Sequence, residues 1–178
     1  MPSAQITSNS RTYFWGALAV VLIAAALRVL PHPPNFSPIA AMALFGGAYL
    51  TRGLWAVLLP VAALFLSDLA LGFHSLMPAV YLSFVLVVFM GYALQERKTP
   101  ARVALASVAG SLVFFAITNF AVWAEGGMYP KTMEGLVACF TLALPFLQNS
   151  LVGDLLFTGA LFGGWALAAR SIPALREA

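Results

Sequence analysis

The chain has 178 residues, of which 62% are hydrophobic and only 8% are charged, and its mean hydropathy is +0.93. A soluble domain usually carries about 25% charged residues to cover its surface, so this composition excludes an ordinary soluble protein. The formal net charge of +3 comes from Lys and Arg residues scattered at the ends of apolar segments, which does not favour nucleic acid as a partner. The composition therefore predicts an integral protein of the lipid bilayer.

The apolar segments are continuous and rich in Ala and Leu, as in 15–27 and 54–66, and do not alternate in polarity. This pattern is typical of transmembrane helices and excludes a transmembrane β-barrel. Cys139 is the only cysteine, which excludes an internal disulfide and a thiolate metal cluster. The predicted fold class is an all-α, polytopic membrane helix bundle, and no cofactor is predicted.

The chain has room for about six transmembrane helices, because each crossing of a bilayer core takes about 20 residues. Residues 31–38 hold several prolines and cannot be helical, so they are expected to form an ordered loop. Pro145 interrupts the last apolar stretch, which predicts a half-buried segment, 132–144, before the final span. The six predicted spans are Tyr13–Leu27, Pro38–Leu50, Leu54–Leu71, Met77–Leu94, Ala101–Trp123 and Pro145–Arg170.

These spans predict one transmembrane domain, 13–170, between two tails, 1–12 and 171–178. Of the Lys and Arg residues, only Arg28 and Lys131 fall on one side of the predicted spans, and all others fall on the opposite side. Positive residues favour the cytoplasmic side, so both tails are predicted to be cytoplasmic. A signal peptide cleaved near Ala26 is the alternative interpretation of the first span.

Two carboxylates and one amide are predicted to lie in the outer third of the membrane. Asp68 lies near the outer end of its span, and Asn119 and Asp154 lie at a similar depth on two other spans. An ionisable side chain within a bilayer is costly and is typical of a functional site. With polar and aromatic neighbours, they predict an outward-facing substrate-binding pocket formed by Asn35, Asp68, His74, Asn119, Trp123, Tyr129, Asn149 and Asp154.

The same side chains also have structural interpretations. Asn, Ser and Thr hold membrane helices together through interhelical hydrogen bonds, and Trp123 is typical of an interfacial aromatic belt. Asp154 is suited to cap a helical segment that begins after Gly153. A buried carboxylate needs donors or a cation. The candidates for that partner are Arg28, Lys131, His32, His74, amides and hydroxyls, or a bound ligand.

No arrangement of residues predicts catalysis. An intramembrane enzyme needs a nucleophile with a base, or a set of metal ligands, and the chain offers isolated carboxylates and two histidines. A metal site would be built from His32, His74, Asp68 and Glu125. Their spacing matches no common metal motif, so the sequence predicts neither an enzyme nor a metal site.

Several short strings resemble those of an uncharacterised family of bacterial inner-membrane proteins assigned to transport. They are His-Pro-Pro-Asn-Phe-Ser-Pro-Ile at 32–39, Leu-Ser-Asp-Leu at 66–69, Thr-Asn-Phe at 118–120, Met-Tyr-Pro at 128–130 and Gly-Asp-Leu at 153–155. The resemblance covers nearly the whole chain, about residues 28–165. That family has no established substrate, and its layout is similar to that of the substrate-binding S components of energy-coupling factor (ECF) transporters.

The resemblance implies six helices with cytoplasmic termini in the bacterial inner membrane, and a pocket closed by outer loops. It implies capture of a small water-soluble molecule, such as a vitamin or another micronutrient, and transport driven by an ECF coupling subunit and its ATPases. Many S components carry an Ala-x-x-x-Ala motif on the first helix, whereas Gly16, Ala17 and Ala19 are here followed four positions later by branched residues. The alternative function is a small structural or assembly subunit whose polar residues only hold helices together.

Overall fold

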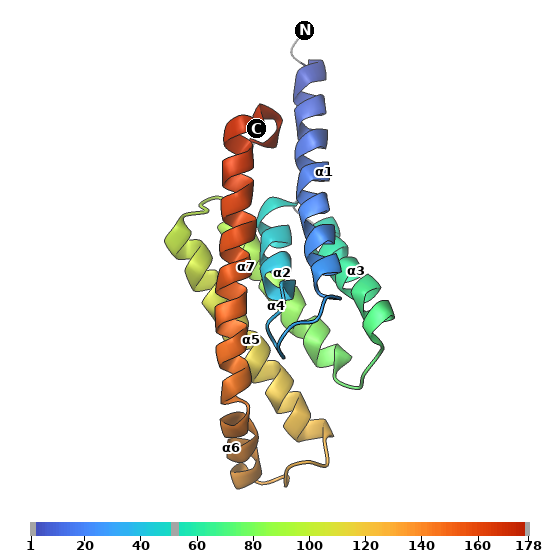
Figure 1. Ribbon diagram of the computed structural model, residues 1–178, viewed down its shortest axis with the longest axis vertical. Coiled ribbons are helices and arrows are strands. Elements are labelled where there is room, and N and C mark those ends of the chain that lie inside the picture. The colour runs from blue at the N-terminus through green and yellow to red at the C-terminus, as the bar shows by residue number, and fades with distance from the viewer. Residues whose placement is uncertain (1–2, 51–53, 177–178) are drawn as a thin grey trace.

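The computed structural model describes residues 3–50 and 54–176, and within these ranges the chain forms helices and no strand. The helices, shown in Figure 1, are α1 (Ser3–Leu27), α2 (Ile39–Tyr49), α3 (Leu54–Leu71), α4 (Met77–Leu94), α5 (Pro100–Glu125), α6 (Met133–Leu142), α7 (Leu144–Ser171) and the short 3-10 helix η1 (Pro173–Leu175). The predicted all-α fold class is confirmed. Arg52, which contributed to the predicted orientation, and residues 1, 2, 177 and 178 of the predicted tails lie outside the described ranges.

Three of the described helices, α4, α5 and α7, are long and apolar enough to cross a membrane. This length and composition identify a membrane protein. The shorter apolar stretches of the described chain are Arg11–Leu27, Ile39–Tyr49, Val57–Leu71 and Met133–Leu142. The count of six spans therefore stays a prediction. In addition, α1 begins at Ser3, so most residues assigned to the N-terminal tail continue the first helix.

Prolines and threonines account for several helix boundaries. Pro145 lies in the first turn of α7 and separates this helix from α6, because a proline lacks the N–H group that only the first turn can spare. Thr99 and Thr132 cap α5 and α6 by accepting a hydrogen bond from a backbone N–H three residues on. By contrast, α2 follows Pro38 with no side-chain cap.

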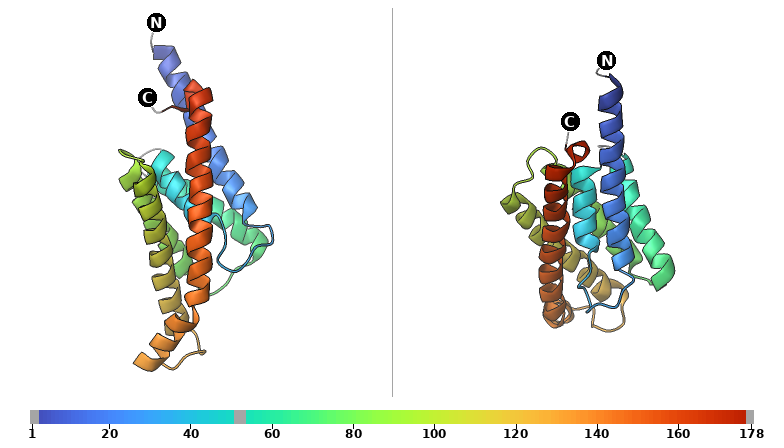
Figure 2. Two further views of the ribbon diagram at one scale, coloured as in Figure 1. Left: turned by 60° about the vertical axis from the view of Figure 1, so that its left-hand side comes forward. Right: turned by 45° about the horizontal axis from the view of Figure 1, so that its top comes forward.

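The short helix α2 lies at the centre of the bundle. All 11 of its residues are buried, and it contacts α1, α3, α4, α5 and α7. Figure 1 and the right-hand view of Figure 2 show it between α1 and α7. A helix that is apolar on every side is stable only when every side is covered. Toward its C-terminal end, Phe45 stacks on Tyr49 at 4.5 Å and packs against Phe162 and Trp165 with ring centroids 5.4 and 5.6 Å away.

The first helix also contributes to this core. Ala17, Val21 and Ala24 on α1 are completely buried, and α1 contacts both α2 and α3. Cleavage near Ala26 would remove these residues and expose the apolar side of α2 that they cover. In this structure the first helix thus covers one side of α2.

Helices α2 and α4 approach to backbone contact. A Cβ atom at Gly47 would lie 2.1 Å from the carbonyl oxygen of Val88, and one at Gly91 would lie 2.4 Å from the carbonyl oxygen of Leu44. No real Cβ atom fits at such distances, so both positions require glycine. Small residues at the crossing of membrane helices allow this close packing.

A buried ion pair joins α1, α3 and α4. Arg28, which follows α1, pairs with Asp68 of α3 and donates a hydrogen bond to Ser67 Oγ at 2.7 Å. The Tyr81 hydroxyl of α4 donates to the second carboxylate oxygen of Asp68 at 2.7 Å. Asp68 is only 1% exposed. Both of its oxygens are thus used within the protein, and Arg28 balances its charge.

The close contact between α2 and α4 leads to a stability prediction. Gly91→Ala should lower the free energy of unfolding by about 1–3 kcal/mol, because the new methyl group would collide with the Leu44 carbonyl. Gly159→Ala on α7 is the matched control, since nothing lies within 4 Å of a Cβ atom there. Thermal unfolding of the purified protein in detergent measures the difference, and equal unfolding temperatures for the two variants would contradict the backbone contact.

The ion pair leads to a second prediction. Asp68→Asn should lower the free energy of unfolding by about 3–5 kcal/mol, because the Arg28 guanidinium would lose its counterion. Tyr81→Phe should cost less, about 1.5–3 kcal/mol, since it removes one hydrogen bond to a charged group and leaves the pair intact. Denaturant titration in detergent, without any added ligand, measures both. A smaller loss for Asp68→Asn than for Tyr81→Phe would rule out a stabilising ion pair.

Candidate functional site

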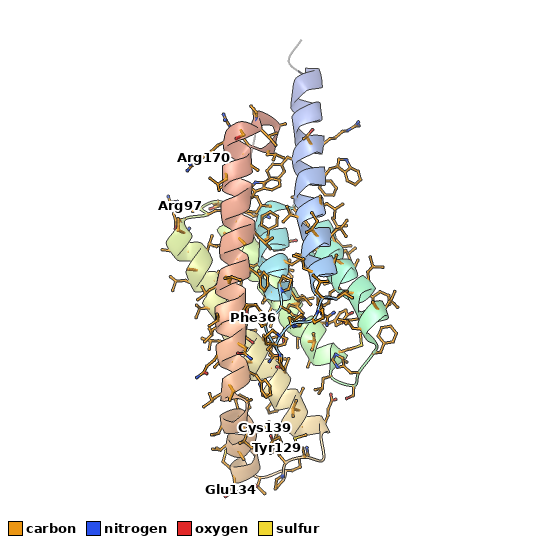
Figure 3. The ribbon with its side chains drawn as sticks, in the orientation of Figure 1. Phe36, Arg97, Tyr129, Glu134, Cys139 and Arg170 are labelled. Carbon is orange, nitrogen blue, oxygen red and sulfur yellow. The ribbon has the colours of Figure 1, made fainter. Side chains whose placement is uncertain are left out.

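A cavity of about 490 Å³ lies at one end of the bundle. Figure 3 shows Tyr129 and Cys139, which line it, at the end of the molecule away from Arg97 and Arg170. Its walls come from the loop 28–38, the start of α2, the loop between α3 and α4, the helices α4 to α7 and the loop between α5 and α6. The polar or sulfur-bearing side chains in its lining belong to Arg28, His32, Asn35, Ser37, His74, Thr118, Asn119, Met128, Tyr129, Cys139, Ser150 and Asp154.

The position of the cavity follows from the length of α2. Its 11 residues rise about 16 Å, whereas the hydrocarbon core of a bilayer is about 30 Å thick. The central helix therefore fills only part of the depth of the bundle. Ile39 and Ala40, in its first turn, line the cavity, so the cavity occupies the space just beyond the beginning of α2.

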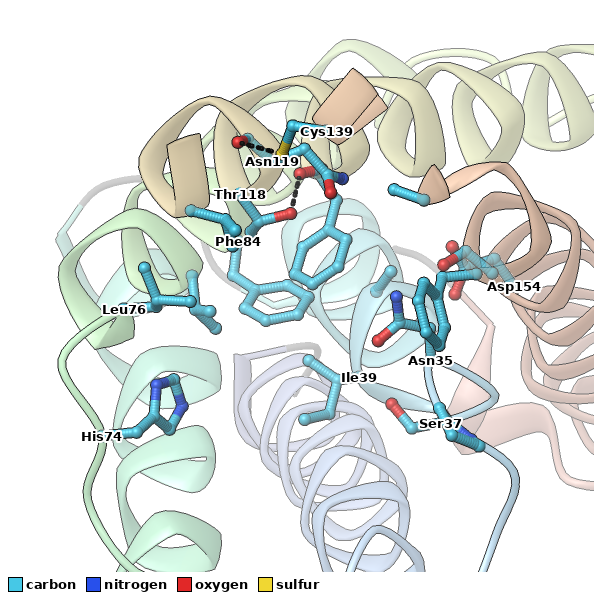
Figure 4. Close-up of a pocket in the computed structure, with 18 of the residues that line it drawn as sticks. Asn35, Ser37, Ile39, His74, Leu76, Phe84, Thr118, Asn119, Cys139 and Asp154 are labelled. Carbon is cyan, nitrogen blue, oxygen red and sulfur yellow. Dashed lines mark hydrogen bonds between the residues drawn. The ribbon is translucent and has the colours of Figure 1, made fainter. Parts of the chain in front are cut away.

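Five of the eight residues predicted for a pocket line this cavity. They are Asn35, His74, Asn119, Tyr129 and Asp154. They come from five different helices and loops and meet only in the folded bundle. Figure 4 shows His74 and Asp154 on opposite sides of the cavity, with Asn35 nearer to Asp154. That these side chains bind a substrate stays a prediction.

The other three predicted residues do not line the cavity. Asp68 is held in its ion pair with Arg28 and is not part of the cavity lining. Trp123 donates through Nε1 to the Pro130 carbonyl at 2.9 Å. Asn149 donates through Nδ2 to the Pro34 carbonyl at 3.0 Å. In each case a partner within the protein uses the polar group, so these residues support the walls of the cavity.

The loop between α5 and α6 is held in place at the rim. The Lys131 ammonium group lies 5.6 Å from the ring centre of Trp123 and donates to the Gly126 carbonyl at 2.8 Å and to the Trp123 carbonyl. Together with the Trp123 hydrogen bond to Pro130, these contacts cross-link the two ends of the loop. Tyr129 is thereby positioned in the cavity wall.

Asp154 is the buried carboxylate that the cavity reaches. It is 5% exposed, and its Oδ2 accepts a hydrogen bond from Ser111 Oγ of α5 at 2.6 Å. Its Oδ1 has no hydrogen-bond partner among the described residues and is accessible from the cavity. Asp154 lies well inside the continuous helix α7, so the interpretation as a helix cap after Gly153 is wrong.

The two polar neighbours of Asp154 on α7 differ in whether their hydroxyl groups have a partner within the protein. Thr158, one turn further along, meets Ser107 of α5 at 3.1 Å between hydroxyl oxygens and thus links the two helices. Ser150, one turn earlier, is 4% exposed and lines the cavity, and its hydroxyl has no partner among the residues that the structure describes. The polar face Ser150, Asp154, Thr158 therefore joins helices at one end and opens to the cavity at the other.

The loop 28–38 covers one side of the cavity and is anchored on α7. Figure 3 shows Phe36 beside this helix, where its ring packs edge-on against Phe157 at 5.5 Å. A Cβ atom at Gly153 would lie 3.1 Å from this ring, so the glycine provides the space for Phe36. Asn35 adopts a left-handed conformation with φ of 59°, which asparagine tolerates better than most residues.

Much of the cavity wall is apolar, and sequence reasoning missed these residues. Phe84, Phe114 and Phe146 line the cavity, and the first two pack against each other with ring centroids 5.4 Å apart. Nothing distinguishes a lining phenylalanine from a lipid-facing one in so apolar a chain. The α5 face that contains Phe115 turns toward α6, where Phe115 packs edge-on against Phe140 at 5.5 Å.

The metal alternative is not supported by the side-chain positions. In the described ranges, no three His, Cys, Asp or Glu side chains gather closely enough to hold a metal ion. Asp68, one of the proposed ligands, is bound to Arg28.

The contact between Phe36 and Gly153 leads to a third prediction. Gly153→Val should displace Phe36 and loosen the loop 28–38, so that the amide groups of the loop exchange with solvent several-fold faster. Gly159→Val is the control, because this position of the same helix has no neighbour within 4 Å. Hydrogen–deuterium exchange followed by mass spectrometry measures both, and unchanged exchange in Gly153→Val would show that Phe36 does not anchor the loop.

Comparisons with known proteins place the chain in a family without assigning it an activity. Residues 8–175 match DUF6580, which is described as a family of unknown function. No curated protein and no solved structure matches the chain, so these comparisons do not support the resemblance to S components. Because the match covers nearly the whole sequence, the chain belongs to the DUF6580 family.

Proposed function

We propose that the chain is a membrane-embedded binding protein that captures a small water-soluble molecule in its cavity, for uptake in the manner of an ECF S component. The observation that carries this proposal is the lining of the cavity. Asp154 and Ser150 are at least 95% buried, yet each presents a polar atom with no partner among the described residues. These atoms face the cavity, so a bound ligand could form the hydrogen bonds that no described residue forms with them.

The size and composition of the cavity also support binding. Small-molecule sites commonly have volumes of about 300–1,000 Å³ and are mostly apolar, with a few polar groups that fix the orientation of the ligand. The cavity, at about 490 Å³, lies within this range. Phe84, Phe114 and Phe146 offer apolar contacts, while Asn35, Asn119 and Asp154 offer hydrogen bonds. This function requires binding alone, and we propose no enzymatic activity.

The proposed topology places the cavity on the outer side of a bacterial inner membrane, with six spans and both termini in the cytoplasm. Arg97 and Arg170 lie at the end of the molecule away from the cavity, as Figure 3 shows. Positive residues favour the cytoplasmic side, which supports this orientation. The short helix α2 would reach the outer side only together with the loop 28–38 that precedes it.

Transport would require energy from partners. The sequence has no Gly-x-x-x-x-Gly-Lys-Ser/Thr loop of the kind that binds nucleotide phosphates. An ECF coupling subunit with its ATPases is therefore the proposed partner. The first helix departs from the Ala-x-x-x-Ala docking motif of many S components, so copurification with such a module is a separate question from ligand binding.

The alternative function is a structural or assembly subunit. The hydrogen bonds from Ser111 to Asp154 and between Ser107 and Thr158 favour this alternative, because they join α5 to α7 without any ligand. The two functions differ in one respect that can be measured. Only the binding protein needs the cavity to be empty of side chains.

This difference gives a fourth prediction. The protein purified in a mild detergent should carry a small molecule detectable by native mass spectrometry, or gain thermal stability with one member of a library of water-soluble micronutrients. Val122→Trp should abolish this binding, because Val122 lines the cavity and the indole would fill it. Val152→Trp is the matched control, since Val152 is 60% exposed on the outside of α7.

The two functions predict different results for these variants. A binding protein gives a bound molecule or a thermal shift that Val122→Trp removes and Val152→Trp preserves. A structural subunit gives neither a bound molecule nor a shift, and Val122→Trp then changes only the unfolding temperature. The second pattern would overturn the binding function.

A further inference from the structure

We infer that the cavity selects an organic cation, a molecule with a protonated nitrogen on an apolar or aromatic body, and that Asp154 is the group that holds the nitrogen. This inference rests on the binding function proposed above and names the chemical class of the ligand. Nothing in the family assignment bears on it, because DUF6580 is a family of unknown function.

The first step is the state of the Asp154 carboxylate. Ser111 donates to Oδ2 at 2.6 Å, and Oδ1 receives no hydrogen bond from any described residue. The side chain lines the cavity although the residue is 5% exposed, so its free oxygen can be reached only from within the cavity. Ser150, one turn away on the same side of α7, leaves a second oxygen available. A donor placed in the cavity would meet two acceptors.

The second step is the balance of charge around the cavity. Arg28 also lines it, but its guanidinium is paired with Asp68 outside the lining. His32 and His74 also line it, and neither forms a described salt bridge with Asp154. Asp154 is the only carboxylate among the described lining residues, and no described salt bridge involves it. An ionised Asp154 therefore lacks a counterion, and an ammonium group on the ligand would provide it.

The third step is the apolar remainder of the cavity. The rings of Phe84, Phe114 and Phe146 lie in its wall together with the half-buried Tyr129. Aromatic faces attract cations and also pack against rings and hydrocarbon. An inorganic cation would leave most of the 490 Å³ volume unfilled, whereas an organic cation matches both the carboxylate and the apolar wall.

Three matched compounds test the class of ligand: phenethylamine, 2-phenylethanol and 3-phenylpropionate. They share a phenyl ring and a two-carbon chain, and they carry a positive, a neutral and a negative end group. Each is titrated against the full-length protein in detergent, and the rise in the thermal unfolding midpoint is followed to saturation. We expect the amine alone to stabilise the protein.

Two substitutions at Asp154 and one at Glu134 test whether the stabilisation by phenethylamine depends on the Asp154 carboxylate. Asp154→Asn should weaken binding of the amine by about tenfold or more, because it removes a charge-assisted hydrogen bond. Asp154→Glu retains the charge and should retain binding. It therefore shows whether substitution at this position by itself prevents folding. Glu134→Gln is the control, since this carboxylate lies on α6 outside the cavity lining and should leave binding unchanged.

The inference is overturned if the alcohol or the acid stabilises the protein as well as the amine does, or if none of the three compounds stabilises it. It is also overturned if Asp154→Asn binds the amine as tightly as the unmodified protein. The binding function fails separately. A neutral or anionic molecule found bound after purification would contradict the selection of an organic cation but support the binding function. The absence of any bound molecule, and of binding by any library member, would contradict the binding function itself.

Discussion

The structure depends on a single constraint, the burial of a helix too short to cross the bundle. Every side of α2 is covered, and its glycine contact with α4 leaves no room to shift it along the bundle axis. The longer helices extend past its beginning, so the centre of the bundle is left without helix over part of its depth. A loop closes this space from one side, and the cavity is what remains. The cavity is thus a result of helix lengths as much as of the residues that line it.

The two intramembrane carboxylates show why composition and depth do not determine a role. Both Asp68 and Asp154 are almost completely buried, and both were expected to face the same pocket. Asp68 has an arginine and a tyrosine as partners, which satisfy both of its oxygens. Asp154 has one serine, which satisfies only Oδ2. The number of donors that the fold brings to each carboxylate therefore separates a structural group from a candidate binding group.

The sequence predicted the elements better than the contacts between them. Proline positions divided α6 from α7 and marked the loop before α2, because proline acts on the local backbone. Arg28, the partner of Asp68, is separated from it by 40 residues. Sequence spacing could not show which of several candidate partners Asp68 would bind. Trp123 and Asn149 were assigned to the pocket by their depth, yet their polar groups bond to loop carbonyls. The aromatic wall was missed because 62% of the chain is hydrophobic, and nothing in the local sequence marks a phenylalanine that lines a cavity.

The packing of Phe36 against Gly153 connects the loop 28–38 with the interior of the site. The glycine directly precedes Asp154, so the ring that closes one side of the cavity rests on the same turn of α7 that carries the open carboxylate. Movement of the loop away from α7 would uncover that turn, and its return would cover it. The contact between Phe36 and Gly153 would therefore influence how fast a molecule bound beside Asp154 exchanges with the outside, as well as how tightly it is held.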